Sequence, residues 1–153
     1  GKNGWRYTPY VIEPAAGVTR GLLVYLLDAY HEETVPNADG EDSSRVVMKL
    51  HPRLAPIKVA VLPLVKKEGL PEIAREMVSG FFKAGINARY DEQHSIGKRY
   101  RRHDEAGTPY CITIDGQTTE DGTVTIRDRD TMEQERISKD EALQVVQKRL
   151  IES

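Results

Sequence analysis

Apolar residues recur along the chain at two spacings, one typical of helices and the other of strands. Near the N-terminus they return every three or four positions, at Leu23, Leu26, Leu27 and Tyr30. This spacing predicts an amphipathic helix over residues 17–31. Residues 57–64 are almost continuously apolar, which is typical of a strand buried on both faces of a sheet. Pro63 is expected to end this strand, because proline has no N–H to donate.

Downstream of this strand, helical and strand patterns alternate. Residues 70–84 are predicted to form a helix with Pro71 in its first turn and Gly85 just beyond its end. The expected core face of this helix consists of Ile73, Met77, Val78 and Phe81. The remaining predicted elements are a short strand over 87–90, a helix over 95–106, strands over 108–115 and 123–128, and a helix over 139–151.

The last helix has both a start signal and an apolar face. Ser138 is its expected N-cap, with Glu141 three residues later as in a capping box. Its apolar stripe is formed by Leu143, Val146 and Leu150. Counted from residue 57, the order β-α-β-α-β-β-α indicates an α/β domain with a mixed sheet. The last two strands meet across the turn region 116–122 and are expected to be antiparallel.

The composition changes between the first helix and this domain. Residues 35–44 are acidic and rich in turn-forming residues, and we interpret them as a linker. Residues 45–50 could form a short strand. A length of 153 residues fits one domain, or one domain with a remnant of another.

Charge and cysteine content narrow the function classes. The net charge of −2 and the pI of about 6.1 indicate no overall basic field, so any RNA contact must come from local patches. The single cysteine, Cys111, excludes an internal disulfide and suits a reducing compartment. Its apolar strand offers no basic neighbour, which indicates an inert thiol. The four histidines are scattered without a second ligand at metal spacing, so no metal site is predicted.

The sequence shows no secretory signal, and its longest apolar stretches are too short to span a bilayer. No membrane partner is therefore expected. The chain begins with Gly-Lys-Asn-Gly and has no initiator methionine, as a processed product would, so the natural protein could be longer.

Three segments carry candidate chemistry, and the first is residues 13–20 (EPAAGVTR), which follow an extended stretch and open the first helix. Arg20 could hold a phosphate chain while Gly17 lets the backbone approach it. Glu13 could pair with a substrate ammonium. On spacing alone, the alternative is a simple turn with a solvated arginine.

The second segment is residues 96–110 (IGKRYRRHDEAGTPY), where basic side chains surround Tyr100. Such a set could hold phosphates and stack on an unpaired base. The alternative is a solvated helix face in which Arg101 pairs with Glu105.

The third segment is residues 121–134 (DGTVTIRDRDTMEQ), where Arg127 and Arg129 alternate with aspartates. Arginines oriented by carboxylates could contact base edges or phosphates. The alternative is an exposed ladder of ion pairs at the end of a strand.

Together these segments resemble the glycyl-tRNA synthetases, which are class II aminoacyl-tRNA synthetases. Residues 13–20 are similar to motif 3, which in that family typically reads Glu-Pro-Ser-Ala-Gly-Val-Asp/Glu-Arg, and Ala15 and Thr19 depart from it. Residues 95–109 match the signature of the C-terminal domain at nearly every position, and 123–134 resemble a further run of that domain. The resemblance extends from residue 7 to about residue 151.

The resemblance implies a division of the chain and a set of site residues. Residues 1–34 would be the end of the catalytic domain with the motif 3 strand and helix, 35–50 a linker, and 51–153 the anticodon-binding domain, an α/β fold with a five-stranded mixed sheet flanked by helices. The positions implied for glycine are Glu13, Pro14, Ala15, Ala16 and Gly17. Those implied for ATP are Gly17, Val18, Thr19 and Arg20. By analogy with related domains, anticodon reading would fall to Glu120, Arg127 and Arg129.

The resemblance also implies an activity and partners. The full-length enzyme would activate glycine with ATP and Mg²⁺, charge tRNA(Gly) for protein biosynthesis in the cytoplasm, and act as a homodimer. The chain alone lacks the other class II motifs, so we expect it to hold no cofactor and no catalytic residue, and to be inactive as a glycine–tRNA ligase. Its own expected role is recognition of the tRNA(Gly) anticodon. The alternative is an accessory or protein-interaction module that reuses this fold, as in DNA-polymerase accessory subunits.

The apolar stripe of the first helix would normally be covered by the catalytic sheet. Without that sheet, we expect this face either to fold back on the domain or to mediate self-association.

Overall fold

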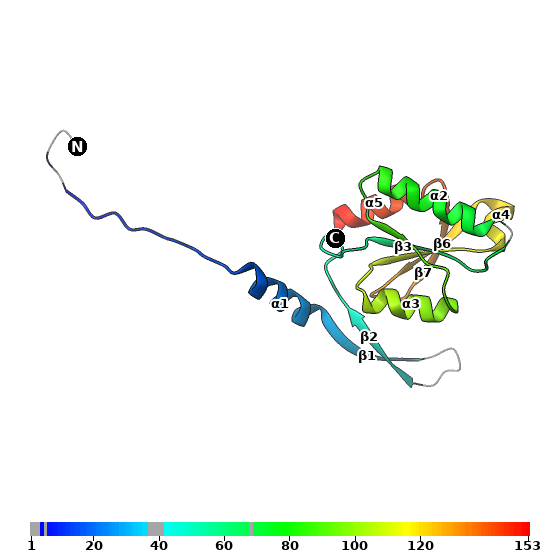
Figure 1. Cartoon of the computed structure of the whole chain (residues 1–153), viewed down its shortest axis with the longest axis horizontal. Coiled ribbons are helices and arrows are strands. Elements are labelled where there is room, and N and C mark those ends of the chain that lie inside the picture. The colour runs from blue at the N-terminus through cyan, green and yellow to red at the C-terminus, as the bar shows by residue number, and fades with distance from the viewer. Residues whose placement is uncertain (1–3, 5, 37–41, 68) are drawn as a thin grey trace.

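The computed structural model describes residues 4, 6–36, 42–67 and 69–153. Three parts follow one another in Figure 1: an arm with helix α1 (Val18–Ala29), a hairpin of β1 (Tyr30–Pro36) and β2 (Asp42–Met48), and an α/β domain. Positions 37–41 of the predicted linker lie outside the described residues.

The domain is built on a five-stranded sheet with the order β4-β3-β5-β6-β7. Its strands are β3 (Val59–Pro63), β4 (Ala88–Tyr90), β5 (Tyr110–Ile114), β6 (Thr123–Asp128) and β7 (Gln134–Ser138). β3 is parallel to both β4 and β5, whereas β6 is antiparallel to β5 and β7. The predicted α/β class, the mixed sheet and the antiparallel pairing of β5 with β6 are therefore confirmed.

Helices cover the two faces of this sheet unequally. Figure 1 shows α2 (Leu70–Lys83) and α5 (Ala142–Glu152) on one face and α3 (Ile96–Glu105) on the other. The large core lies on the α2 and α5 side, where strand residues such as Val61 and Ile112 pack against Phe81 and Val146. The α3 side has a small cluster, Ala60, Leu62 and Cys111, against which Ile96 and Tyr100 pack. Because a strand alternates its side chains between faces, β3 and β5 are buried on both.

Several local predictions are confirmed. β3 ends at Pro63, and Pro71 lies in the first turn of α2. Gly85 follows α2 with a φ of 76°, the left-handed conformation that ends many helices. The predicted faces also point inward: Ile73, Met77, Val78 and Phe81 of α2, and Leu143, Val146 and Leu150 of α5, all belong to the core or pack against it.

Three elements of the domain differ from the sequence prediction. Residues 116–122, expected as a turn, contain the helix α4 (Gly116–Asp121), which Asp115 caps by accepting from the Thr118 N–H. β7 was not predicted, because it is a largely polar edge strand without a clean apolar alternation. The capping box at the last helix is wrong: α5 begins at Ala142, and Ser138 ends β7 instead.

The hairpin replaces the end of the predicted first helix and much of the predicted linker. α1 ends at Ala29, and β1 then pairs with β2 in the register that places Tyr30 opposite Met48. β-branched residues favour this extended conformation, and Val35 and Val47 are buried in it. The apolar spacing of the first helix is followed by a polar segment, and the strand that pairs with this segment begins only at Asp42, so periodicity alone did not show the hairpin.

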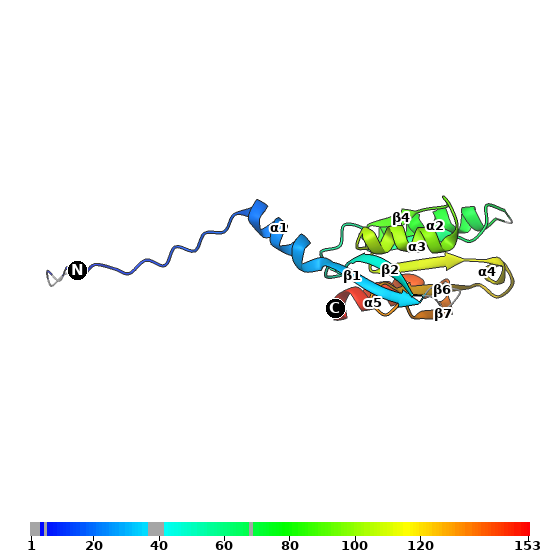
Figure 2. The ribbon, with the colours of Figure 1, turned by 90° about the horizontal axis from the view of Figure 1, so that it is seen from below.

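The arm and α1 project away from the domain (Figure 2). Residues 6–17 carry no helix or strand, so the motif 3 strand expected there is not formed. The exposed fractions of Leu23, Leu27 and Tyr30 are 56%, 67% and 49%, so the stripe does not fold back on the domain. Self-association through this stripe stays a prediction, which sedimentation at several concentrations would test. Within the described residues, no helix combines the length and apolar character that crossing a membrane requires.

Candidate nucleic-acid interface

The α3 face of the sheet changes from apolar to polar along the strand order. The strand register aligns Leu62 with Thr113, Thr113 with Thr125, and Thr125 with Arg136. Residues aligned in this way point to the same face. α3 packs over the apolar end of this row, which lies on β3 and β5. The part on β6 and β7 is left as a polar surface beside the helix.

A groove of about 710 Å³ lies at this boundary, and we call it the α3 groove. Its lining consists of Lys98, Arg101, Arg102 and Arg127 with Tyr100, Gln134, Met132, Glu105, Gly97 and the hairpin residue Pro36. Cationic side chains thus outnumber the single carboxylate, although the whole chain is slightly acidic. Arg102 and Arg127 pair with Asp91 and Asp104, so the basic character of the groove rests on Lys98 and Arg101, near the ring of Tyr100. Cations near an aromatic ring are the combination that binds single-stranded nucleic acid.

The turn between β6 and β7 places two of the lining residues, Met132 and Gln134, at the groove. A carboxylate oxygen of Asp128 accepts from the N–H groups of Asp130 and Thr131, at 2.8 and 3.1 Å. Met132 closes the turn with a φ of 60°, a conformation that non-glycine residues seldom adopt. The chain then enters β7, where the side chain of Gln134 is exposed.

The floor of the groove is formed by Tyr100 and Arg127. The Tyr100 hydroxyl lies 2.6 Å from Oγ1 of Thr113, and burial raises the pKa of this phenol. The guanidinium carbon of Arg127 lies 4.7 Å from the centroid of the Tyr100 ring, a cation–π geometry. Both terminal nitrogens of Arg127 donate to Asp104, at 2.8 and 3.1 Å. Arg127 is therefore fixed by two partners and is only 6% exposed.

The other two residues implied for anticodon reading lie outside the groove. Arg129 is 2% exposed and donates to the carbonyl oxygens of Leu50 and Gly107 and to the carboxylate of Asp130. Glu120 is exposed on α4, which precedes β6, whereas Arg127 lies toward the far end of that strand. The structure therefore does not bring the three together. The alternative, an exposed ladder of ion pairs, is wrong because both arginines are buried.

The basic residues of α3 divide by burial. Lys98 is exposed and Arg101 is half-buried, and both line the groove. Arg99 is buried and donates to the carbonyl oxygens of Pro63 and Asp91, which ties α3 to the ends of β3 and β4. Burial also lowers the pKa of His103. The alternative, a solvated helix face, therefore does not describe α3. Arg101, which that alternative paired with Glu105, donates to the Ser43 hydroxyl of β2 at 3.1 Å.

The residues implied for glycine and ATP do not form a site in this structure. Residues 13–20 are exposed throughout and lie on the arm and the first turn of α1. They line neither the α3 groove nor the hollow beside α1. The φ of Gly17 is −82°, which any residue can adopt, so its glycine is not required by the backbone seen here. Their roles in substrate binding stay a prediction.

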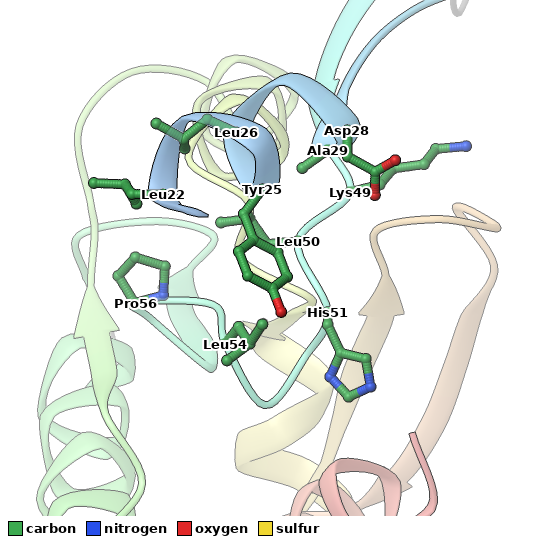
Figure 3. Close-up of a pocket in the computed structure, with 10 residues that line it drawn as sticks. All are labelled: Leu22, Tyr25, Leu26, Asp28, Ala29, Lys49, Leu50, His51, Leu54 and Pro56. Atoms are coloured by element: carbon green, nitrogen blue, oxygen red, sulfur yellow. The ribbon is translucent and has the colours of Figure 1, made fainter. Parts of the chain in front are cut away.

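A second hollow of about 620 Å³ lies between α1 and the segment after β2 (Figure 3). Tyr25 extends from α1 toward Leu54 and His51, and Leu22 and Leu26 line the same side. This lining is chiefly apolar, so it lacks the cluster of cations that a phosphate backbone needs. The α3 groove is therefore the candidate nucleic-acid interface.

Sequence reasoning missed the partners that hold this groove together. Asp104 and Gln134 were not singled out, although Asp104 carries a usable signal. Ile96, Tyr100, His103 and Asp104 recur at helical spacings of three and four, which marks the inward face of α3. A carboxylate on an inward face requires a cationic partner, and the third segment supplies one in Arg127.

Among the described residues, no group of three or more histidine, cysteine, aspartate or glutamate side chains is placed to hold a metal ion.

Cys111 provides a prediction about reactivity. It is 2% exposed on the α3 face of β5, and burial raises the pKa of its thiol to about 12. The thiolate is the reactive form, so we expect native protein to react with Ellman's reagent far more slowly than urea-unfolded protein. Equal rates in the two states would contradict this placement of Cys111.

The comparisons with known proteins agree with this architecture. A family model described as "Anticodon binding domain" matches residues 58–149, which is more than half of the chain. The chain therefore belongs to the anticodon-binding domain family. This family is the class that the mixed sheet and its three covering helices define.

The particular proteins that the chain resembles are glycine–tRNA ligases. It is 53% identical over 145 residues to that of Rhodopirellula baltica, 53% over 145 residues to that of Thermobifida fusca, and 54% over 140 residues to that of Corynebacterium efficiens. These matches cover 95%, 95% and 92% of this chain and 27%, 31% and 30% of the relatives. The chain thus spans less than a third of their length, and the resemblance to glycyl-tRNA synthetases is confirmed over nearly all of it.

Proposed function

We propose that the chain binds the anticodon arm of tRNA(Gly) in the α3 groove, as the anticodon-reading part of a glycine–tRNA ligase. The observation that carries this proposal is the groove itself, which Lys98, Tyr100 and Arg101 of α3 line beside the polar part of the sheet. The family match supports an anticodon as the ligand, and the names of the relatives support glycine tRNA.

The groove residues suit different parts of an unpaired loop. Lys98 and Arg101 carry charge at the wall and would contact phosphates. Met132 offers a surface on which a base can stack. The exposed amide of Gln134 has both a donor and an acceptor for a base edge. Since stacking tolerates any base, sequence reading would fall chiefly to Gln134.

Titration with an anticodon stem–loop tests this function. The chain is expected to bind the tRNA(Gly) stem–loop more tightly than a stem–loop with an altered anticodon, by roughly tenfold for each base read. Gln134→Ala should reduce that difference, because the amide that contacts the base edge is lost. Equal affinities of the wild type for both loops would contradict anticodon reading.

The salt dependence of binding separates phosphate contacts from base contacts. The slope of log K against log salt is negative, and Lys98→Ala should reduce its magnitude by about 0.7, as expected for one lost phosphate contact on single-stranded RNA. Lys148→Ala is the matched control, because Lys148 is exposed on α5, on the opposite face of the sheet. A slope that both substitutions change equally would indicate binding without the groove.

We also propose that residues 13–20 contribute to the glycine and ATP site of the complete enzyme, a cytoplasmic class II synthetase that uses Mg²⁺ and acts as a homodimer. The resemblance to motif 3 supports this role. The chain alone should not catalyse glycine-dependent ATP–pyrophosphate exchange, because these residues are exposed and line neither of the two hollows described above. Measurable exchange by the purified chain would disprove that expectation.

One observation favours a second function, a protein-interaction role. α1 exposes an apolar surface that includes Leu23, Val24 and Leu27, each more than half exposed. An exposed apolar surface of this kind marks a contact with another protein segment. Retention of a protein partner together with failure to bind any stem–loop would favour this second function over RNA recognition.

A further inference from the structure

The β1–β2 hairpin lies outside the part of the chain that matches the anticodon-binding family, yet it holds one of the most deeply buried side chains. Arg45 of β2 is 1% exposed. An isolated two-stranded hairpin has no core of its own, so Arg45 is buried by docking on the domain. Figures 1 and 2 show the hairpin beside α3, and β2 contacts that helix.

The guanidinium of Arg45 joins the hairpin to two parts of the domain. Its Nη2 donates to the carbonyl oxygen of Arg129, just after β6, at 2.9 Å. Its Nη1 lies 3.5 Å from the carboxylate of Asp104 on α3. Within the hairpin, Nη2 also lies 3.0 Å from Glu33, the residue directly opposite on β1.

Asp104 couples this anchor to the floor of the α3 groove. Its side chain is fully buried, and it accepts the two hydrogen bonds from Arg127 described above. One buried carboxylate therefore lies between Arg45 of the hairpin and Arg127 of the groove. Because a buried charge requires its partners, a change on one side of Asp104 alters the orientation of the other.

The hairpin also touches the wall of the groove. Ser43, two residues before Arg45 on the same strand, accepts a hydrogen bond from Arg101 at 3.1 Å. Pro36, at the end of β1, lines the groove directly. Once Arg45 is docked, the position of β2 is fixed, and Ser43 then holds Arg101 at the groove.

We propose that Arg45 is a positioning residue for RNA binding. It docks the hairpin, and the docked hairpin holds Arg101 and, through Asp104, Arg127 in the geometry that the groove presents to RNA. This inference rests on the proposed binding of an anticodon arm in the α3 groove.

The test compares Arg45→Met with Lys49→Met in the full 153-residue chain. Lys49 also pairs with Glu33, but its substitution leaves the contacts of Arg45 with Asp104 and Arg129 in place. In Arg45→Met we expect faster hydrogen exchange in β1 and β2 and roughly tenfold weaker binding of the tRNA(Gly) stem–loop. Lys49→Met should stay near the wild type in both. A slow reaction of Cys111 with Ellman's reagent would show that each variant remains folded. Arg45→Lys keeps the charge and should retain part of the affinity for the stem–loop.

A double-mutant cycle with Arg101→Ala separates positioning from general destabilisation. If Arg45 acts through Arg101, then Arg45→Met should weaken RNA binding less in the Arg101→Ala background than in the wild type. Equal effects in the two backgrounds would overturn this route. If hydrogen exchange in β1 and β2 were unchanged in Arg45→Met, the role of Arg45 as the anchor of the hairpin would be overturned, whether or not RNA binds. Failure of the wild type to bind the stem–loop would overturn the proposed function, which is a separate result.

Discussion

Replacing Asp104 by Ala is expected to lower the free energy of unfolding by about 3–5 kcal/mol. Asp104 is fully buried, and it accepts two hydrogen bonds from Arg127 and lies 3.5 Å from Arg45. Without it, two buried guanidinium groups would lose their common counter-charge. Urea unfolding followed by circular dichroism measures the effect, as a fall of roughly 2 M in the midpoint.

Glu135→Ala is the matched control for this measurement. Glu135 accepts from Arg149 at 2.6 Å, but its side chain is 62% exposed, so water replaces the partner when the pair is broken. We expect a loss below about 1 kcal/mol there. If Asp104→Ala and Glu135→Ala destabilised the domain equally, the buried network of Asp104, Arg127 and Arg45 would not stabilise the domain more than an exposed ion pair does.

Charge reversal at the wall of the α3 groove should have the largest effect on RNA affinity. The double variant Lys98→Glu with Arg101→Glu replaces two cations that line the groove by anions. We expect roughly 100-fold weaker binding of the tRNA(Gly) stem–loop at low salt, since two phosphate contacts become repulsive. Fluorescence anisotropy across a salt series measures both the affinity and its slope.

The control for charge reversal must change the charge equally on another face. Lys83→Glu with Lys148→Glu does so on α2 and α5, which cover the opposite face of the sheet. If long-range attraction alone drove binding, both double variants would weaken it to a similar degree. A loss confined to the groove variant would place the RNA contact on α3.

Sequence periodicity predicted the buried parts of the fold and missed the polar ones. β3 and α2 have strong apolar patterns and clear proline and glycine boundaries, so their existence and limits were found. β7 and α4 carry no such pattern, because β7 lies at the edge of the sheet and α4 is a short capped turn of helix. The β1–β2 hairpin depends on the pairing of two separate segments, which the pattern of one segment does not reveal.

The sequence identified the segments of the candidate site but not the role of each residue. The runs around Tyr100 and Arg127 do meet at one groove. Their charges could not be divided into binding and structural groups, because that division depends on distant partners. Arg45 illustrates this most clearly: its acceptor, the carbonyl oxygen of Arg129, lies 84 positions along the chain.

The same reasoning explains why arginines that match a family signature need not touch RNA. Arg129 donates to two carbonyl oxygens and a carboxylate within the chain, and Arg99 donates to carbonyl oxygens at the ends of β3 and β4. The Arg99 bonds hold α3 against the sheet, and the Arg129 bonds join the end of β6 to the segments that follow β2 and α3. Such residues build the surface that Lys98 and Gln134 present to a ligand.

Photocrosslinking tests most directly the claim that the anticodon loop lies in the α3 groove. A tRNA(Gly) stem–loop with 4-thiouridine in its anticodon loop would be irradiated with the chain, and the attached peptides located by mass spectrometry. We predict attachment within residues 97–102 and 131–135, which carry Tyr100, Met132 and Gln134. Attachment confined to α2, α5 or the N-terminal arm would contradict the account.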